Sequence, residues 1–98
     1  MGAMHSIADS LMAPHTEQYS YELCRRHIDE IVTVSDDELH HGMQQLFAEL
    51  KLAVEPACVA ATAALLGPLR GRLQDKCIGV LLCGTNTDPA TFARHMSA

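Results

Sequence analysis

The stretch IVTVSDDELHHGMQQLFAEL, residues 31–50, decides the fold predicted for this chain. Its first four residues, Ile31–Val34, are β-branched throughout and predict a short buried strand. Ser35 and Glu38 then form the S-x-x-E pattern of a capping box, which predicts the start of a helix at this point. One face of that helix is expected to be apolar and to carry Leu39, Met43, Leu46, Phe47 and Leu50.

Upstream of this stretch the sequence predicts one more helix. Thr16 can cap a helix over residues 17–27, and we expect Tyr19 and Leu23 on its buried side, with Tyr21 as a further candidate. Residues 5–15 mix apolar and turn-forming residues, which predicts a loop or a short helix.

Downstream of it the sequence predicts two helices and a second strand. Pro56 fits the first turn of an Ala-rich helix over residues 57–66, which is apolar nearly all round and therefore expected to be buried. The apolar run Cys77–Cys83 is typical of a parallel strand covered on both faces. Asp88 can cap a final helix. The order helix, strand, helix, helix, strand, helix predicts an α/β fold, a small parallel-strand fragment with helices packed on it. Because two strands make a poor sheet, both are expected to need neighbours.

The composition fits one small globular domain. Of the 98 residues, 48% are hydrophobic but only 4% are aromatic, so aliphatic side chains and Met must fill the core. The net charge of −5 argues against a nucleic-acid partner, because phosphate backbones are bound by clustered Lys and Arg. The longest strongly apolar stretch, residues 56–66, is too short to cross a bilayer, so no membrane partner is expected. We expect a single domain over residues 5–98 and interpret residues 1–4 as a cloning scar.

Neither the cysteines nor the histidines are spaced as metal ligands. Four cysteines contain no CxxC pair, which argues against a zinc ribbon and favours a reducing, cytoplasmic compartment. His40 and His41 are adjacent on a helix and diverge by about 100°, so they cannot share a metal. We therefore expect surface histidines, and we attribute the acids of residues 36–38 to helix capping rather than to a cation site.

Two positions are open to a functional role on the residues alone. Glu55 stands between an apolar segment and the Ala-rich helix, where an unpaired carboxylate is costly, although it can equally be an ordinary helix N-terminal residue. Cys83 and Gly84 end the second predicted strand, the place where open α/β sheets hold ligands.

Four segments in register resemble a known family. They are SIAD (6–9), IDEIVTVSDDEL (28–39), KLAVEPA (51–57) and LLCGTNTD (81–88). Their order and spacing resemble the C-terminal catalytic region of threonine/serine dehydratases and serine racemases, which are fold-type II pyridoxal-phosphate enzymes. The resemblance covers nearly the whole chain after residue 4.

The resemblance implies which residues border the cofactor ring. Cys83 holds the position of the family's Ser or Cys that hydrogen-bonds the pyridine nitrogen. Such a weak partner does not force protonation of the ring, which suits β-elimination of water. Glu55 would lie beside the same ring edge, Gly84 and Asn86 belong to the same final motif as Cys83, and Ser10 would lie near the other side of the ring.

This sequence also departs from the family pattern. Cys58 and Thr85 replace glycines, so each adds a side chain where the family leaves room. The family's Schiff-base lysine motif and glycine-rich phosphate loop are absent from these 98 residues, and neither Lys51 nor Lys76 matches that motif. We therefore assign no catalytic residue and expect this chain alone to bind no pyridoxal phosphate.

Three functions are open at this point. The first is a truncated dehydratase-like protein that retains half of a cofactor pocket and is inactive alone. The second is a non-enzymatic protein that self-associates through its unpaired strands, most simply as a dimer, with exchanged elements as one way to form it. The third, a small enzyme with Cys83 as nucleophile, is disfavoured because no histidine stands beside Cys83 in the sequence.

Overall fold

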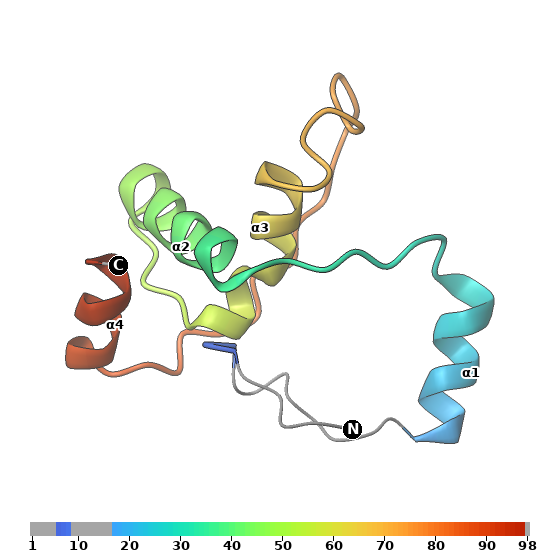
Figure 1. Cartoon of the computed structure of the whole chain (residues 1–98), viewed down its shortest axis with the longest axis horizontal. Coiled ribbons are helices and arrows are strands. Elements are labelled where there is room, and N and C mark those ends of the chain that lie inside the picture. The colour runs from blue at the N-terminus through green and yellow to red at the C-terminus, as the bar shows by residue number, and fades with distance from the viewer. Residues whose placement is uncertain (1–5, 9–16, 98) are drawn as a thin grey trace.

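A computed structural model describes residues 6–8 and 17–97, and within these ranges every regular element is helical. The elements are α1 (Gln18–His27), α2 (Asp36–Leu50), the 3-10 helix η2 (Pro56–Val59), α3 (Ala60–Leu66) and α4 (Pro89–Met96). Figure 1 shows α2, α3 and α4 gathered in one group, while α1 stands apart at the end of an extended connection. No helix of the described part of the chain combines the length and apolarity that a membrane span requires.

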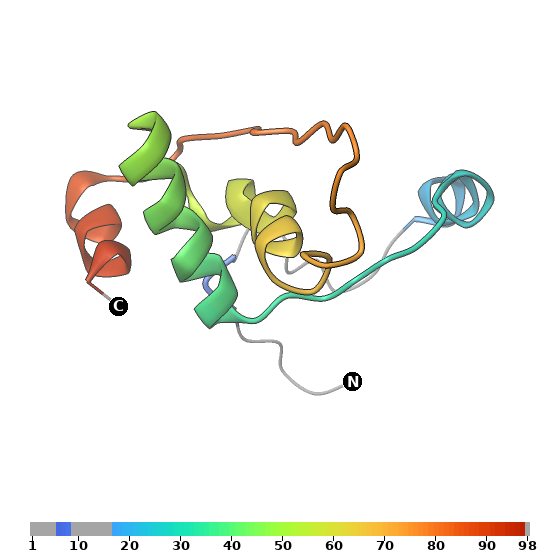
Figure 2. The same ribbon diagram turned by 90° about the horizontal axis from the view of Figure 1, so that it is seen from above.

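The α/β prediction is wrong for this chain, because residues 31–34 and 77–83 are extended but belong to no strand in the described ranges. An extended segment becomes a strand only when its N–H and C=O groups pair with a neighbour. Figure 2 shows the segment before α4 passing along one side of α2 and α3, with no second extended segment beside it. Both segments consequently expose apolar side chains, with Ile31 and Leu81 each 77% exposed.

The capping box predicted from Ser35 and Glu38 is confirmed and begins α2. Ser35 Oγ accepts from the Glu38 amide at 3.1 Å, and Glu38 Oε1 accepts from the Ser35 amide at 2.9 Å. The helix ends at Lys51, which has a left-handed conformation with φ of 58°. The capping box at Ser35 and the left-handed residue Lys51 therefore define the two ends of α2 although no neighbouring sheet is present in the described ranges.

The core lies between α2, η2 and α3. It is formed by the buried residues Ala8, Leu39, Met43, Leu46, Val54, Cys58, Val59 and Ala63. The predicted apolar face of α2 is right for Leu39, Met43 and Leu46, but Phe47 and Leu50 are exposed. Gly42 allows the close approach of α2 to η2, since a Cβ there would lie 2.8 Å from Val59 Cγ2.

The first and last helices differ in how well the sequence predicted them. Helix α1 has no buried residue, so the buried side expected at Tyr19 and Leu23 is wrong. Helix α4 begins as predicted, with Asp88 accepting from the Thr91 amide at 3.1 Å and Pro89 at its first position. The radius of gyration of 14.5 Å exceeds the about 13 Å typical of a compact domain of this size, which reflects the outlying α1.

Candidate functional site

The four segments that carry the family resemblance converge in space, beginning with the first two. Ser6 Oγ donates to Asp36 Oδ1 at 2.7 Å, and the Ile7 amide donates to the same carboxylate at 3.2 and 3.3 Å. Asp36 is the first residue of α2, so the start of this helix anchors the N-terminal segment. The neighbouring Ala8 is buried in the core.

The third and fourth segments meet at Glu55 and Gly84. The Glu55 amide donates to the Gly84 carbonyl at 3.4 Å. A Cβ at Gly84 would lie only 2.7 Å from Glu55 Oε1, so the glycine leaves the space that this carboxylate occupies. Glu55 is therefore in direct contact with Gly84, a residue of the same final motif as Cys83.

A pocket of about 420 Å³ opens beside this contact. Its walls come from the N-terminal segment, the start of η2, the segment before α4 and α4 itself. The lining residues are Ile7, Glu55, Pro56, Asn86, Thr87, Asp88, Thr91 and His95. The pocket thus brings together Glu55 and Asn86, with Gly84 behind Glu55.

Other residues that the resemblance singled out lie elsewhere. Cys83 is exposed and is not among the described residues that line the pocket. Cys58 is 2% exposed and packs in the core, so its thiol fills space between helices. Thr85 lines a separate hollow beside Phe92. Ser10 lies outside the described residues, as do residues 1–4 and the predicted cap Thr16.

His95 and Asp88 are pocket residues that the sequence analysis did not assign to the site, since it predicted Asp88 only as a helix cap. His95 Nδ1 lies 3.1 Å from His40 Nε2, and both rings are half-buried, so the prediction of surface histidines is wrong for this pair. Burial, followed by the charges of His40 and Arg94, lowers the pKa of His95, while Asp36 acts in the opposite direction. Hydrogen bonds from the Thr91 side chain and amide lower the pKa of Asp88. The available signal for His95 was its place three residues after Phe92, on the face of α4 that meets α2.

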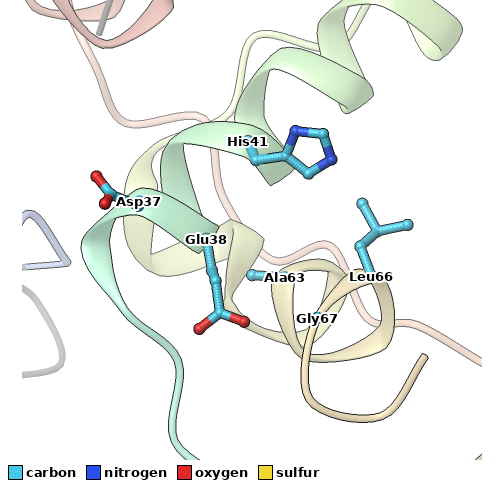
Figure 3. A pocket seen from close by; sticks show the side chains of 6 residues that line it. All are labelled: Asp37, Glu38, His41, Ala63, Leu66 and Gly67. Carbon is cyan, nitrogen blue, oxygen red and sulfur yellow. The ribbon is translucent and has the colours of Figure 1, made fainter. Parts of the chain in front are cut away.

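A second hollow, of about 200 Å³, lies between α2 and α3. Figure 3 shows Glu38 pointing toward Ala63 and Gly67, with the ring of His41 near Leu66. Asp37 and Glu38 make this hollow acidic, yet the described residues contain no group of three side chains able to hold a metal. Glu38 serves the helix cap, as the sequence predicted.

Comparison with known proteins supports the resemblance. The family model of the pyridoxal-phosphate dependent enzymes matches residues 1–84. Over 96 residues the chain is 71% identical to a phenylserine dehydratase of Ralstonia pickettii, an alignment that covers 98% of this chain and 29% of that protein. Over 93 residues it is 37% identical to an L-threo-3-hydroxyaspartate ammonia-lyase of Saccharomyces cerevisiae and 32% identical to a serine racemase of Schizosaccharomyces pombe. Each of these two alignments covers 94% of this chain and 28% of the relative.

The chain therefore spans less than a third of the length of these relatives, all of which act on amino acids by name. The matched family model covers most of the 98 residues, including Glu55 and Gly84. This chain belongs to the family of pyridoxal-phosphate dependent enzymes.

Proposed function

We propose that this chain forms one wall of the catalytic pocket of a dehydratase that eliminates water from 3-hydroxy amino acids. The observation that carries the proposal is that Glu55, which contacts Gly84, lines a single pocket together with Asn86. The names of the relatives favour a 3-hydroxy amino acid with an aromatic or acidic side chain as the substrate. A reducing compartment, the cytoplasm, belongs to the same proposal because all four cysteines are free.

The pocket residues fit only part of the cofactor. Glu55 and Asn86 offer polar groups to a ring edge. The described lining contains two carboxylates, Glu55 and Asp88, and neither Lys nor Arg. A phosphate dianion would be repelled by these carboxylates and would find neither a Lys nor an Arg among the described lining residues to pair with. The pocket of this chain therefore does not fit the complete cofactor, and we derive no reaction step through it.

The residues of this chain can supply only part of the cofactor site. Lys51 cannot serve as the cofactor lysine in this arrangement, since its Nζ donates to the Ala48 carbonyl at 2.9 Å and it is not among the described pocket residues. The lysine and the phosphate-binding backbone must come from chain outside these 98 residues. This chain would contribute the ring-edge wall and the Cys83 position.

A chimera tests the proposal. The 96 residues of the Ralstonia phenylserine dehydratase that match this chain are replaced by the present sequence, which is 71% identical over that length. We expect a folded chimera that releases ammonia from phenylserine, and we expect Glu55→Gln to reduce its kcat/KM while the exposed control Glu49→Gln does not. A folded chimera that is inactive, or one in which Glu55→Gln has no effect, would contradict the proposal.

Self-association is a second function that one observation favours. The extended segment 77–83 exposes a run of apolar side chains, with Ile78 39%, Val80 36% and Leu82 37% exposed in addition to Leu81. Long, exposed apolar edges are typical sites of pairing with another chain. We propose that the isolated chain forms a homodimer through this segment.

Sedimentation equilibrium tests the dimer. We expect the wild-type chain to sediment as a dimer and Leu81→Glu to sediment as a monomer, because a buried charge would disfavour the interface. The matched control Leu50→Glu changes an exposed residue on α2, away from this segment, and should leave the dimer intact. A folded wild-type monomer would refute self-association.

A further inference from the structure

The contact between α2 and α4 includes an imidazole pair. His40 Nε2 and His95 Nδ1 lie 3.1 Å apart, and the ring centroids are separated by 5.2 Å. In the same contact the Gln44 side chain donates to the Met96 carbonyl at 3.1 Å. The rings of Phe47 and Phe92 also pack edge-on there, with their centroids 5.4 Å apart. The imidazole pair is therefore one of the links that hold α4 against α2.

The pair also borders the pocket. His95 lines the same pocket as Glu55 and Asn86, and it is carried by α4. Movement of α4 away from α2 would remove His95 from the lining. The position of α4 therefore decides whether the pocket is closed on this side.

Protonation decides whether the two facing nitrogens can form a hydrogen bond. When both rings are neutral, or when they share one extra proton, one facing nitrogen donates and the other accepts. When both rings are cationic, both facing nitrogens carry hydrogens and two like charges meet across about 3 Å. We propose that the His40–His95 pair is a pH-sensitive latch that keeps α4 closed over the pocket and releases it on acidification.

The surroundings of the pair set the direction of the response. Arg94 on α4 opposes protonation of His95, Asp36 on α2 favours it, and Glu55 and Asp88 line the same pocket. Burial is the largest cause that lowers the pKa of His95 from its ordinary 6.5. A lowered pKa means that the closed state binds fewer protons than the open state. The latch is therefore fully closed above pH 6.5 and is lost as the pH falls through the lower pKa of the closed state.

Methyl NMR of the whole 98-residue chain tests the latch. With methionine methyl groups labelled with carbon-13, Met96 reports the docking of α4, and the fully buried Met43 reports the core. As the pH falls from about 8 to about 5, we expect the Met96 signal to move toward its undocked position. The shift should correspond to a decrease of at least about threefold in the ratio of closed to open molecules. The Met43 signal should stay constant, and the midpoint should lie below the ordinary histidine value of 6.5.

Two variants make the test specific. His40→Ala removes one ring, so the Met96 signal should start nearer the undocked position and lose most of its pH response. His41→Ala is the matched control, because it lies next to His40 on α2 but faces the other hollow, and it should titrate like the wild type. The proposal is overturned if Met96 does not respond to pH, if His40→Ala responds like the wild type, or if Met43 moves together with Met96.

Discussion

Gly42→Ala is the substitution that most sharply tests how α2 packs on η2. Gly42 lies inside α2 and is buried. On an exposed helix an alanine would raise the free energy of unfolding by about 1 kcal/mol, because glycine is a poor helix former. Here the new Cβ would lie 2.8 Å from Cγ2 of Val59, a side chain that is 0% exposed. Overpacking of this kind costs about 1–3 kcal/mol.

The gain in helix propensity and the cost of the clash oppose each other. Because the clash is larger, Gly42→Ala should lower the free energy of unfolding by about 1 kcal/mol. Urea unfolding followed by far-UV circular dichroism gives the comparison. Gly71→Ala is the matched control, since a Cβ there meets no atom within 4 Å and no described glycine has a positive φ. That control should raise stability by about 0.4–1 kcal/mol.

A double variant identifies the cause of the loss. In Gly42→Ala combined with Val59→Ala, the clashing methyl group is gone, so the combined loss should be smaller than the sum of the single losses by about 1 kcal/mol. A Gly42→Ala protein that is more stable than the wild type would refute the packing of α2 on η2.

Two further predictions concern helix starts. Ser35→Ala removes the acceptor for the Glu38 amide and should lower the free energy of unfolding by about 0.5–2 kcal/mol, whereas Ser20→Ala on the exposed α1 should change it little; equal urea midpoints for the two variants would mean that α2 begins elsewhere. Asp88 accepts hydrogen bonds from Thr91 that hold its pKa below the ordinary 3.8, so its contribution to α4 is present above pH 3.8 and is lost as the pH falls through the lower pKa of the folded chain. The Thr91 amide resonance should report this loss in the wild type and not in Asp88→Ala, and an acid transition that persists in the variant would show that Asp88 does not control it.

The parts of the fold that the sequence predicted are those whose causes are local. The capping box of Ser35 and Glu38 and the cap at Asp88 need only residues within three positions, and both are present as predicted. The prediction of strands at residues 31–34 and 77–83 was wrong because a strand needs a neighbouring backbone to pair with. The described ranges supply no such neighbour for either segment. The prediction of a buried side for α1 was wrong because no other described element covers its apolar residues.

Some residues of the candidate site could be named from the sequence and others could not. The resemblance assigned Glu55, Gly84 and Asn86 to one cofactor site, which composition and periodicity alone did not do. The structure places Glu55 against Gly84 and puts Glu55 and Asn86 in one pocket, while their role toward the cofactor stays a prediction. Cys83 is exposed and is not among the described pocket residues, and the segment that carries it belongs to no strand. The pairing of His40 with His95 spans 55 positions of sequence, so no local pattern could reveal it.

The central claim is that this chain carries one wall of the cofactor pocket and not the parts that hold the cofactor. Pyridoxal phosphate is added to the 98-residue chain, the mixture is reduced with borohydride, and labelled lysines are located by mass spectrometry. We predict only slow, substoichiometric labelling spread over Lys51 and Lys76, and no release of ammonia from phenylserine, serine or threonine. Stoichiometric labelling of a single lysine together with lyase activity would contradict the claim.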